Sequence, residues 1–402
     1  MAALSPRWPD GSDLIGAWSR SPLHSPVLPP DQSRRVTTID KEAVLNRIAE
    51  EKVTVGVDTH KHFHVAVALS AQGARLGELT VAADPGGYEQ LLSWAQSLGT
   101  PWCFGVEGCG SYGQGLVSHL RRHDQRVVEA GRPDRRDRRE RGKSDPIDAE
   151  NAARAVLAGT ATGVPKSADG TSEMIREVKV ARDTAVKAKS QAIITLKALI
   201  VTAPEELRGE LQPLTKAKLR ERCAGLRPGR LDTPLAAAKH ALRALARRWQ
   251  SLEHEIKEHD RLLDDLTAQA APALREAFGI GVDVAAEMLV LAGDNPERIH
   301  SEAAFAKLCG ASPIPASSGN TQRHRLNWAG HRQANSALYR SVIVRMRFHP
   351  PTIAYVQRRT AEGKSKREII RCLKRYLARE IYRHIREATP VPKPVSVGNL
   401  SL

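Results

Sequence analysis

Four acidic residues in the N-terminal half of the chain stand where they could bind metal ions together. Asp58 and Glu107 each follow a short apolar run that predicts a buried β-strand. Asp145 and Asp148 are three residues apart at a predicted helix start, so both face one side of that helix. Carboxylates brought together repel one another unless cations lie among them. Two divalent ions about 3.5–4 Å apart, Mg²⁺ or Mn²⁺, would neutralise the four acids and could activate a nucleophile towards a phosphodiester.

Each of these acids also has an ordinary interpretation. An Asp after a strand is often a turn residue, and Asp145 followed by Pro146 could simply begin a helix. Their joint position on the elements of one fold favours the metal site. His60, His62 and His64 alternate along a strand edge, and we predict a solvent-facing or substrate-side role for them rather than a zinc site.

The predicted elements around the acids form an α/β domain. Three strands at residues 52–58, 62–69 and 75–82 are joined by tight connections, which predicts an antiparallel meander. Helices and strands then alternate at residues 86–98, 102–107, 112–123, 126–129 and 145–157. A meander followed by this alternation is typical of an RNase H-like domain, which we expect over residues 51–165.

The rest of the chain reads as mostly helical. Residues 166–272 carry apolar side chains at three- and four-residue steps, which predicts a long helix or coiled coil that pairs subunits into a dimer or tetramer. Residues 227–229 (RPG) mark a break between helices. We expect a helical C-terminal domain over residues 273–388, a disordered extension and lead-in over 1–50, and a flexible tail over 389–402.

The charge is strongly basic and concentrated. The 402 residues hold 61 Lys or Arg against 45 Asp or Glu, a net charge of +16. Residues 320–386 alone hold 17 basic and 3 acidic side chains, and residues 121–143 hold 10 and 5. Such patches favour a polyanionic partner, with nucleic acid the commonest, although a basic ribosomal or membrane-surface protein would share the charge.

The cysteines and the hydropathy of the chain indicate the cellular compartment in which the protein works. Five scattered cysteines without a Cys-x-x-Cys pair indicate neither a zinc framework nor disulfides, which fits a reducing cytoplasm. No stretch approaches the roughly 18 apolar residues of a membrane span. We therefore expect a cytoplasmic protein, associated with the nucleoid, without a membrane partner.

Three sequence blocks carry a family resemblance. Residues 55–61 (VGVDTHK), 105–112 (GVEGCGSY) and 143–153 (KSDPIDAENAA) resemble blocks of the DEDD transposases. These are insertion-sequence recombinases related to the Piv-type DNA invertases, with a RuvC-like N-terminal domain. The resemblance extends from about Lys52 to Arg386. It implies that Asp58, Glu107, Asp145 and Asp148 are the metal-binding acids.

The C-terminal half adds further blocks. Residues 278–291 resemble the hairpin of a helix-hairpin-helix motif, with Phe278 where the family more often has Pro. Residues 304–319 are similar to the family's Gly-Leu-x-Pro…Ser-Gly segment, with Ala311 and Ser312 as departures. Residues 323–338 match the basic stretch that follows it, with His331 where the family usually has Asn.

The resemblance implies a serine nucleophile that forms a phosphoserine link to DNA. The matching position is Ser318, with Ser317 as the rival. A serine hydroxyl needs a base or metal to activate it. The alternative interpretation is that residues 317–320 (SSGN) form an ordinary loop without a catalytic role, because Ser, Gly and Asn are common turn residues.

The leading hypothesis is therefore an enzyme that cuts and rejoins DNA for a mobile element. Some relatives are directed by an RNA from the element, which the basic surfaces here permit. The rivals are a RuvC-like junction nuclease that uses metal-activated water, and a non-catalytic nucleic-acid-binding remnant. The predicted nucleic-acid-binding residues are Arg141, Lys143, Arg323, Arg325, Arg332, Arg340 and Arg345.

Overall fold

The computed structural model describes residues 52–131, 144–320 and 324–388. The predicted extension and tail lie outside these ranges, as do Arg141, Lys143 and Arg323.

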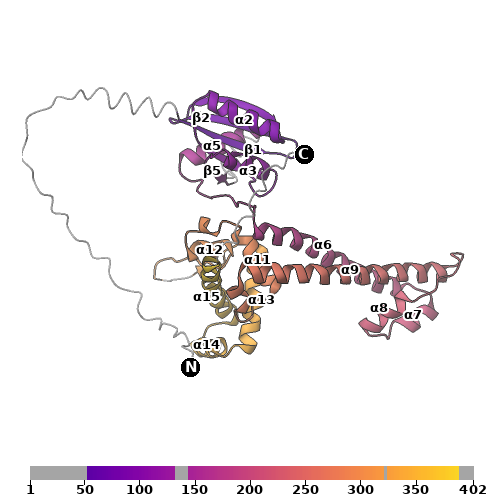
Figure 1. Cartoon of the computed structure of the whole chain (residues 1–402). Coiled ribbons are helices and arrows are strands. Elements are labelled where there is room, and N and C mark those ends of the chain that lie inside the picture. Colours follow the sequence, from indigo (N-terminus) through magenta and orange to yellow (C-terminus); the bar gives the residue numbers. More distant parts are fainter. Residues whose placement is uncertain (1–51, 132–143, 321–323, 389–402) are drawn as a thin grey trace, which may run out of the picture. The chain divides into compact units, whose positions relative to one another are not determined.

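A five-stranded mixed sheet forms the N-terminal part (Figure 1). Its order is β3-β2-β1-β4-β5, with β1 (Lys52–Thr59) in the centre. β2 (Phe63–Ser70) and β3 (Arg75–Ala82) continue antiparallel from β1, as the predicted meander requires. β4 (Thr100–Glu107) and β5 (Val127–Ala130) run parallel to β1. The expected α/β architecture is confirmed and is consistent with a RuvC-like fold.

Helices cover both faces of this sheet. Because side chains alternate along a strand, the valines of β1 at positions 53, 55 and 57 all point to one face. There they pack with α2 (Pro85–Ser97) and α3 (Gln114–Arg122). The other face is covered by α5 (Asp145–Leu157), whose Ala149 and Ala153 pack on β2. The bounds of α5 are those expected from the sequence.

The middle of the chain is helical, as predicted. It contains α6 (Thr171–Val201), α7 (Glu205–Leu211), α8 (Lys216–Ala224) and α9 (Pro234–Ala270), and the predicted break at residues 227–229 lies between α8 and α9. α6 and α9 pack against each other, with Leu196 of α6 and Leu242 of α9 in one buried cluster. Much of the apolar seam of α9 is thus covered within the chain, while Leu262 remains 50% exposed, and pairing between subunits stays a prediction.

The C-terminal part is mostly helical around one large core, to which Phe305, Leu338 and Ile381 contribute. Its elements are α10 (Pro272–Glu276), α11 (Val282–Ala292), the 3₁₀ turn η1 (Pro296–Arg298), α12 (Glu302–Leu308), β6 (Ile314–Pro315), β7 (His324–Arg325), α13 (Arg332–Phe348), α14 (Pro350–Ala361) and α15 (Lys366–Glu387). Across the described residues, no helix combines the length and apolar character needed to span a bilayer.

Candidate active site

Strand alternation places two of the predicted acids on the same face of the sheet. β1 and β4 are parallel neighbours, with Gly56 opposite Gly105. Asp58 and Glu107 lie two residues beyond these glycines, so both side chains project to the face that α5 covers. Both residues are partly exposed, as expected at the edge where the strands end.

The two glycines allow α5 to approach the sheet closely. A Cβ atom on Gly56 would lie 2.0 Å from the carbonyl oxygen of Ala149. A Cβ on Gly105 would lie 2.6 Å from Cγ2 of Val156. Because no other residue type fits beneath the helix, these positions fix its height above the sheet. The first turn of α5, which carries Asp145 and Asp148, is thereby held beside the end of β1.

The structure brings two of the four acids, Asp58 and Asp145, together around His60. The Nε2 atom of His60 lies 3.4 Å from Oδ2 of Asp58 and 3.3 Å from Oδ2 of Asp145. Candidate ligand atoms of these three residues all lie within 4.8 Å of one another. Asp148 is buried, with 5% of its surface exposed.

The carboxylates of α5 act electrostatically on Asp58 at the end of β1. Burial raises the pKa of the Asp58 carboxyl, the charge of His60 works against this, and the carboxylates of Asp148 and Asp145 raise it further. Closely spaced carboxylates in a partly buried site are the donor set that a divalent cation neutralises. The residues present therefore fit a divalent metal ion.

Glu107 is positioned through the backbone. The hydroxyl of Thr59 donates a hydrogen bond of 2.8 Å to the carbonyl oxygen of Glu107, which ties the end of β1 to that of β4. Glu107 thus stands at the neighbouring strand end, but it is not among the residues whose ligand atoms gather within 4.8 Å of one another, which are Asp58, His60 and Asp145.

The two candidate serines lie in a different part of the chain. β6 and β7 form a short antiparallel ribbon, in which Ile314 pairs with Arg325. Ser317 and Ser318 are exposed in the segment that follows β6. Gly319 next to them has φ of 54°, a left-handed conformation that glycine adopts readily.

Comparisons with known proteins cover both of these regions. Residues 55–203, which include the four acids, match the DEDD transposase family of the IS110 type. Residues 271–357, which include both serines, match the transposase IS116/IS110/IS902 family. The chain belongs to the IS110-type DEDD transposases. It is a DNA transposase of an insertion sequence, an enzyme whose family uses divalent metal ions. The search of curated proteins gives no match.

Three of the transposase's predicted nucleic-acid-binding arginines are exposed. Arg325 lines a cavity of about 220 Å³ together with Arg371 and Lys374. Arg332 stands at the first position of α13. Arg340 is 51% exposed and forms an ion pair with Asp283.

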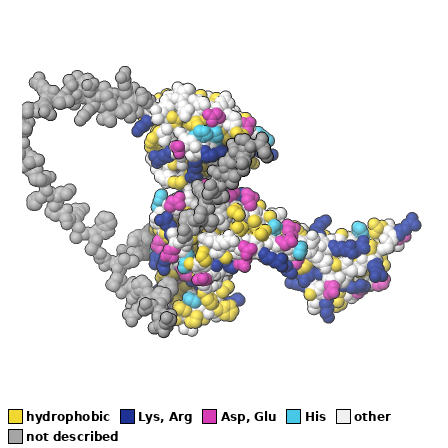
Figure 2. Space-filling model, viewed as in Figure 1, with side chains coloured by type: hydrophobic (Ala, Val, Ile, Leu, Met, Phe, Trp, Pro, Cys, Tyr) yellow, Lys and Arg dark blue, Asp and Glu magenta, His cyan; other side chains and the backbone are white. Residues whose placement is uncertain are grey.

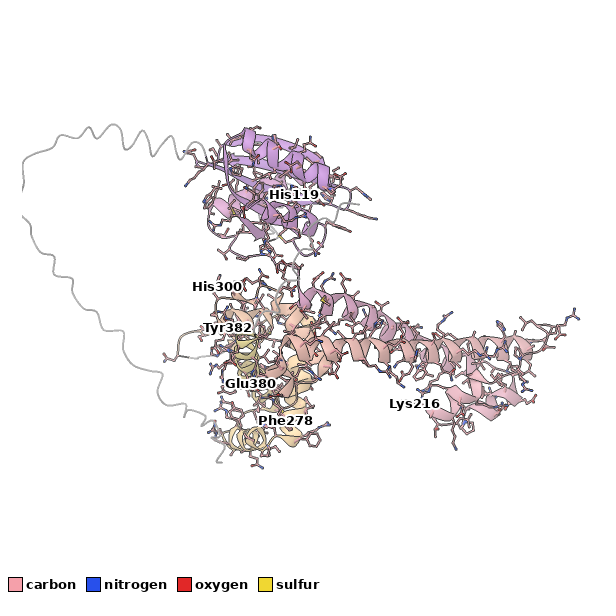
Figure 3. The ribbon with its side chains drawn as sticks, in the orientation of Figure 1. His119, Lys216, Phe278, His300, Glu380 and Tyr382 are labelled. Carbon is pink, nitrogen blue, oxygen red and sulfur yellow. The ribbon has the colours of Figure 1, made fainter. Side chains whose placement is uncertain are left out.

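The placement of Arg345 corrects the sequence prediction. Its side chain is only 9% exposed. Its Nε donates to the carbonyl oxygen of Phe278 at 2.8 Å, and its two Nη atoms donate to Glu380 at 2.7 Å each. Figure 3 shows Phe278 and Glu380 close together in the C-terminal part. Arg345 is a structural residue, because these partners occupy the guanidinium.

The contact between Arg345 and Phe278 also concerns the helix-hairpin-helix motif predicted at residues 278–291. A tight turn at residues 277–281 does connect α10 and α11, and Gly279 within it has φ of 74°. A Cβ on Gly279 would lie 3.3 Å from Cγ of Arg345, so the arginine packs directly against the turn. Phosphate binding by this turn stays a prediction.

The predictions for two of the histidines have different outcomes. His64 is fully buried and stacks on Tyr88, on the face of the sheet away from α5, so the predicted edge role is wrong for it. His60 is partly exposed beside Asp58 and Asp145, a position compatible with the predicted substrate-side role, although its place among the candidate ligand atoms was not predicted. Its position two residues after Asp58 was the available signal.

A further basic surface was missed by the sequence analysis. Residues 204–250 hold 11 Lys or Arg and 5 Asp or Glu. In Figure 2, dark-blue side chains cover much of the α7 and α8 surface. One of these arginines, Arg220, stacks on Trp249 with 3.8 Å between its Cζ and the ring centre.

Proposed function

We propose that this transposase cuts and rejoins DNA with a two-metal acidic centre and a serine nucleophile. Asp58, Glu107, Asp145 and Asp148 would hold two Mg²⁺ or Mn²⁺ ions. The observation that supports this most strongly is the gathering of Asp58 and Asp145 around His60, within 4.8 Å. Bound there, the ions would supply Lewis-acid stabilisation for charge on the phosphate.

Ser318 is the proposed nucleophile. Its Oγ forms a bond to phosphorus, the bond from phosphorus to the leaving sugar oxygen breaks, and that oxygen takes up a proton. The DNA end is then held as a phosphoserine ester. A hydroxyl of a second strand attacks this ester, and the proton it loses returns to the Oγ of Ser318. Each step exchanges one phosphodiester for another, so no energy source is needed.

The metal centre is tested by Asp145→Asn, which keeps the shape of the side chain and removes its charge. We expect Mn²⁺ binding, measured by electron paramagnetic resonance, to weaken and strand cleavage to be lost. The matched control is Glu150→Gln on the same helix, whose carboxylate pairs with Arg154. Equal Mn²⁺ binding and cleavage by the two variants would contradict the proposal.

The serine is tested by Ser318→Ala beside Ser317→Ala. We expect Ser318→Ala to lose the covalent protein–DNA adduct on denaturing gels, together with rejoining, while Ser317→Ala keeps both. The reverse result assigns the nucleophile to Ser317. If both variants still cleave DNA without forming an adduct, the second candidate function is favoured, a RuvC-like junction nuclease that uses activated water. The metal-binding acids alone would support that function as well.

The basic surfaces are the proposed contacts for nucleic acid. Arg325, Arg332 and Arg340 would contact DNA phosphates, so affinity should fall steeply with salt. A guide RNA from the element is a second proposed partner, to be sought by sequencing RNA that co-purifies with the protein. We also propose a dimer or tetramer, measurable by light scattering, acting at the nucleoid in the cytoplasm.

A further inference from the structure

A second group of ligand-type side chains lies on the face of the sheet opposite α5. It consists of Glu89 on α2, His119 on α3 and His123, the residue that directly follows α3. One candidate ligand atom from each residue lies within 4.8 Å of those of the other two. His119 is labelled in Figure 3, in the N-terminal α/β part. This group shares no residue with the acidic centre.

The two histidines are spaced to bind one ion. They are four residues apart at the C-terminal end of α3, where His123 is the capping residue, and their ring centroids lie 4.4 Å apart. Both face Glu89, whose Oε2 lies 3.3 Å from Nε2 of His119 and 3.9 Å from Nε2 of His123. The three nearest donor atoms thus come from two helices and converge on one point.

His119 points to a ligand most directly. The residue is 8% exposed, and its Nε2 is shielded from solvent. Its approach to Glu89 lacks the alignment of a good hydrogen bond. A buried nitrogen without a well-aligned hydrogen bond destabilises the folded state unless another partner, such as a metal ion, binds its lone pair.

The orientation of both rings is fixed by neighbouring groups. Nδ1 of His123 lies 2.9 Å from the carbonyl oxygen of His119, an acceptor, so Nδ1 carries the proton and Nε2 the free lone pair. Metal-binding histidines are commonly held in this way. Behind His119 stands Tyr88, which in turn stacks on the buried His64 of β2. The sheet thus supports the group through a continuous row of rings.

We propose that Glu89, His119 and His123 form a site for a transition-metal ion such as Zn²⁺. Two imidazole nitrogens and one carboxylate oxygen are a common donor set for Zn²⁺, with the remaining position open to water. Mg²⁺, which prefers oxygen ligands, is disfavoured here. Since the ligands come from α2 and α3, the bound ion links these two helices on the outer face of the domain.

The experiment uses the tag-free full-length protein and Zn²⁺ or Co²⁺ as probes. Asp58→Asn with Asp145→Asn forms the background, because it removes the other candidate metal group. Zn²⁺ affinity is measured by competition with a chromogenic chelator. The visible spectrum of bound Co²⁺ reports nitrogen ligands and coordination number.

In that background we expect one Zn²⁺ site per chain. Glu89→Gln and His123→Gln, both at exposed side chains, should weaken it by about tenfold or more. The matched control is His254→Gln on α9, since His254 is also exposed and faces a single carboxylate, that of Glu258. It should bind Zn²⁺ like the background protein.

Three results would overturn the site: no Zn²⁺ binding in the background protein, equal affinity of the His123→Gln and His254→Gln proteins, or a Co²⁺ spectrum that His123→Gln leaves unchanged. Circular dichroism checks that each variant is folded. Mg²⁺-dependent cleavage by the Glu89→Gln protein with its acids intact should equal that of the unaltered protein, so this site and the proposed function can fail separately.

Discussion

Replacing Arg345 by Met removes the buried guanidinium that joins the α10–α11 turn to α15. Met retains much of the length and apolar volume of the arginine stem, so packing along α13 changes little. What disappears is one hydrogen bond to the carbonyl oxygen of Phe278 and two charged ones to Glu380. The variant thus isolates the polar role of the side chain.

The expected loss of stability follows from burial. Removing one partner of a buried ion pair costs about 3–5 kcal/mol, because the other charge stays behind without compensation. The Glu380 side chain is 28% exposed and can recover some hydration. We therefore expect the lower end of that range, about 3 kcal/mol. Changing Glu380 to Gln in the same protein removes the stranded charge and should restore part of the loss.

The assay is unfolding in urea, beside DNA binding at several salt concentrations. Arg340→Met is the control, since Arg340 lies on the same helix but its ion pair with Asp283 is half exposed. That variant should lose less than about 1 kcal/mol. If Arg345→Met unfolds at the urea concentration of the unaltered protein while its DNA affinity loses salt dependence, Arg345 contacts phosphate and the structural assignment is wrong.

Three further predictions follow from the same reasoning. Gly56→Ala should lower the unfolding free energy by about 3 kcal/mol and abolish cleavage, because the new methyl group displaces α5. The control Gly110→Ala places its new Cβ where nothing lies within 4 Å, so urea unfolding and cleavage should both stay unchanged. Burial alone would raise the pKa of Glu380, but the hydrogen bonds and the charge of Arg345 outweigh burial and hold this pKa below the ordinary 4.5. The ionised Glu380 should therefore stabilise the fold fully above about pH 4.5, and this stabilisation should be lost as the pH falls through the lowered pKa. The difference in unfolding free energy between the unaltered and Glu380→Gln proteins should accordingly be smaller at about pH 4 than at neutral pH. Lys179→Met should lower the unfolding free energy by about 3 kcal/mol, because it removes a buried ammonium group. The Nζ of Lys179 lies 3.0 Å from Oδ1 of Asp283 and 3.5 Å from Oε2 of Glu287. An unchanged midpoint in urea would show that this ammonium group does not stabilise the fold.

The sequence could indicate that Asp58 and Asp145 lie near each other, because the signals there are local. Each strand end is marked by an apolar run followed by an acid, and the Asp145–Pro146 pair marks a helix start. The parallel direction of β1 and β4 follows from the alternation of strands and helices, whereas the register that sets Gly56 opposite Gly105 is known only from the structure. The height of α5 above the sheet was not predicted, because it depends on contacts of these glycines with residues some 50 to 100 positions along the chain.

Arg345 and His64 show where the sequence was insufficient. Arg345 lies among other arginines at helical spacing, and nothing nearby separates it from those that are exposed. Its partner Glu380 is 35 residues away, so only the tertiary fold identifies the pair. His64 lies on a strand whose alternation is clear. Which face of that strand meets α2, however, is decided by the sheet order and not by the strand itself.

The pairing of charges in the C-terminal part separates its arginines into two groups. All three acids of residues 320–386 are engaged within the chain: Glu380 with Arg345, Glu362 with Arg359, and Glu368 with the N-terminus of α15. Acids from outside the segment, Glu302 and Asp283, pair with further arginines of α15 and α13. A second group of exposed arginines forms no ion pair with any described residue: Arg325, Arg332, Arg347, Arg367, Arg371, Arg383 and Arg386. Because the three acids of this segment already have partners, its remaining positive charge attracts counterions or a polyanion. The unpaired group, rather than the basic segment as a whole, is therefore where phosphate contacts should be concentrated.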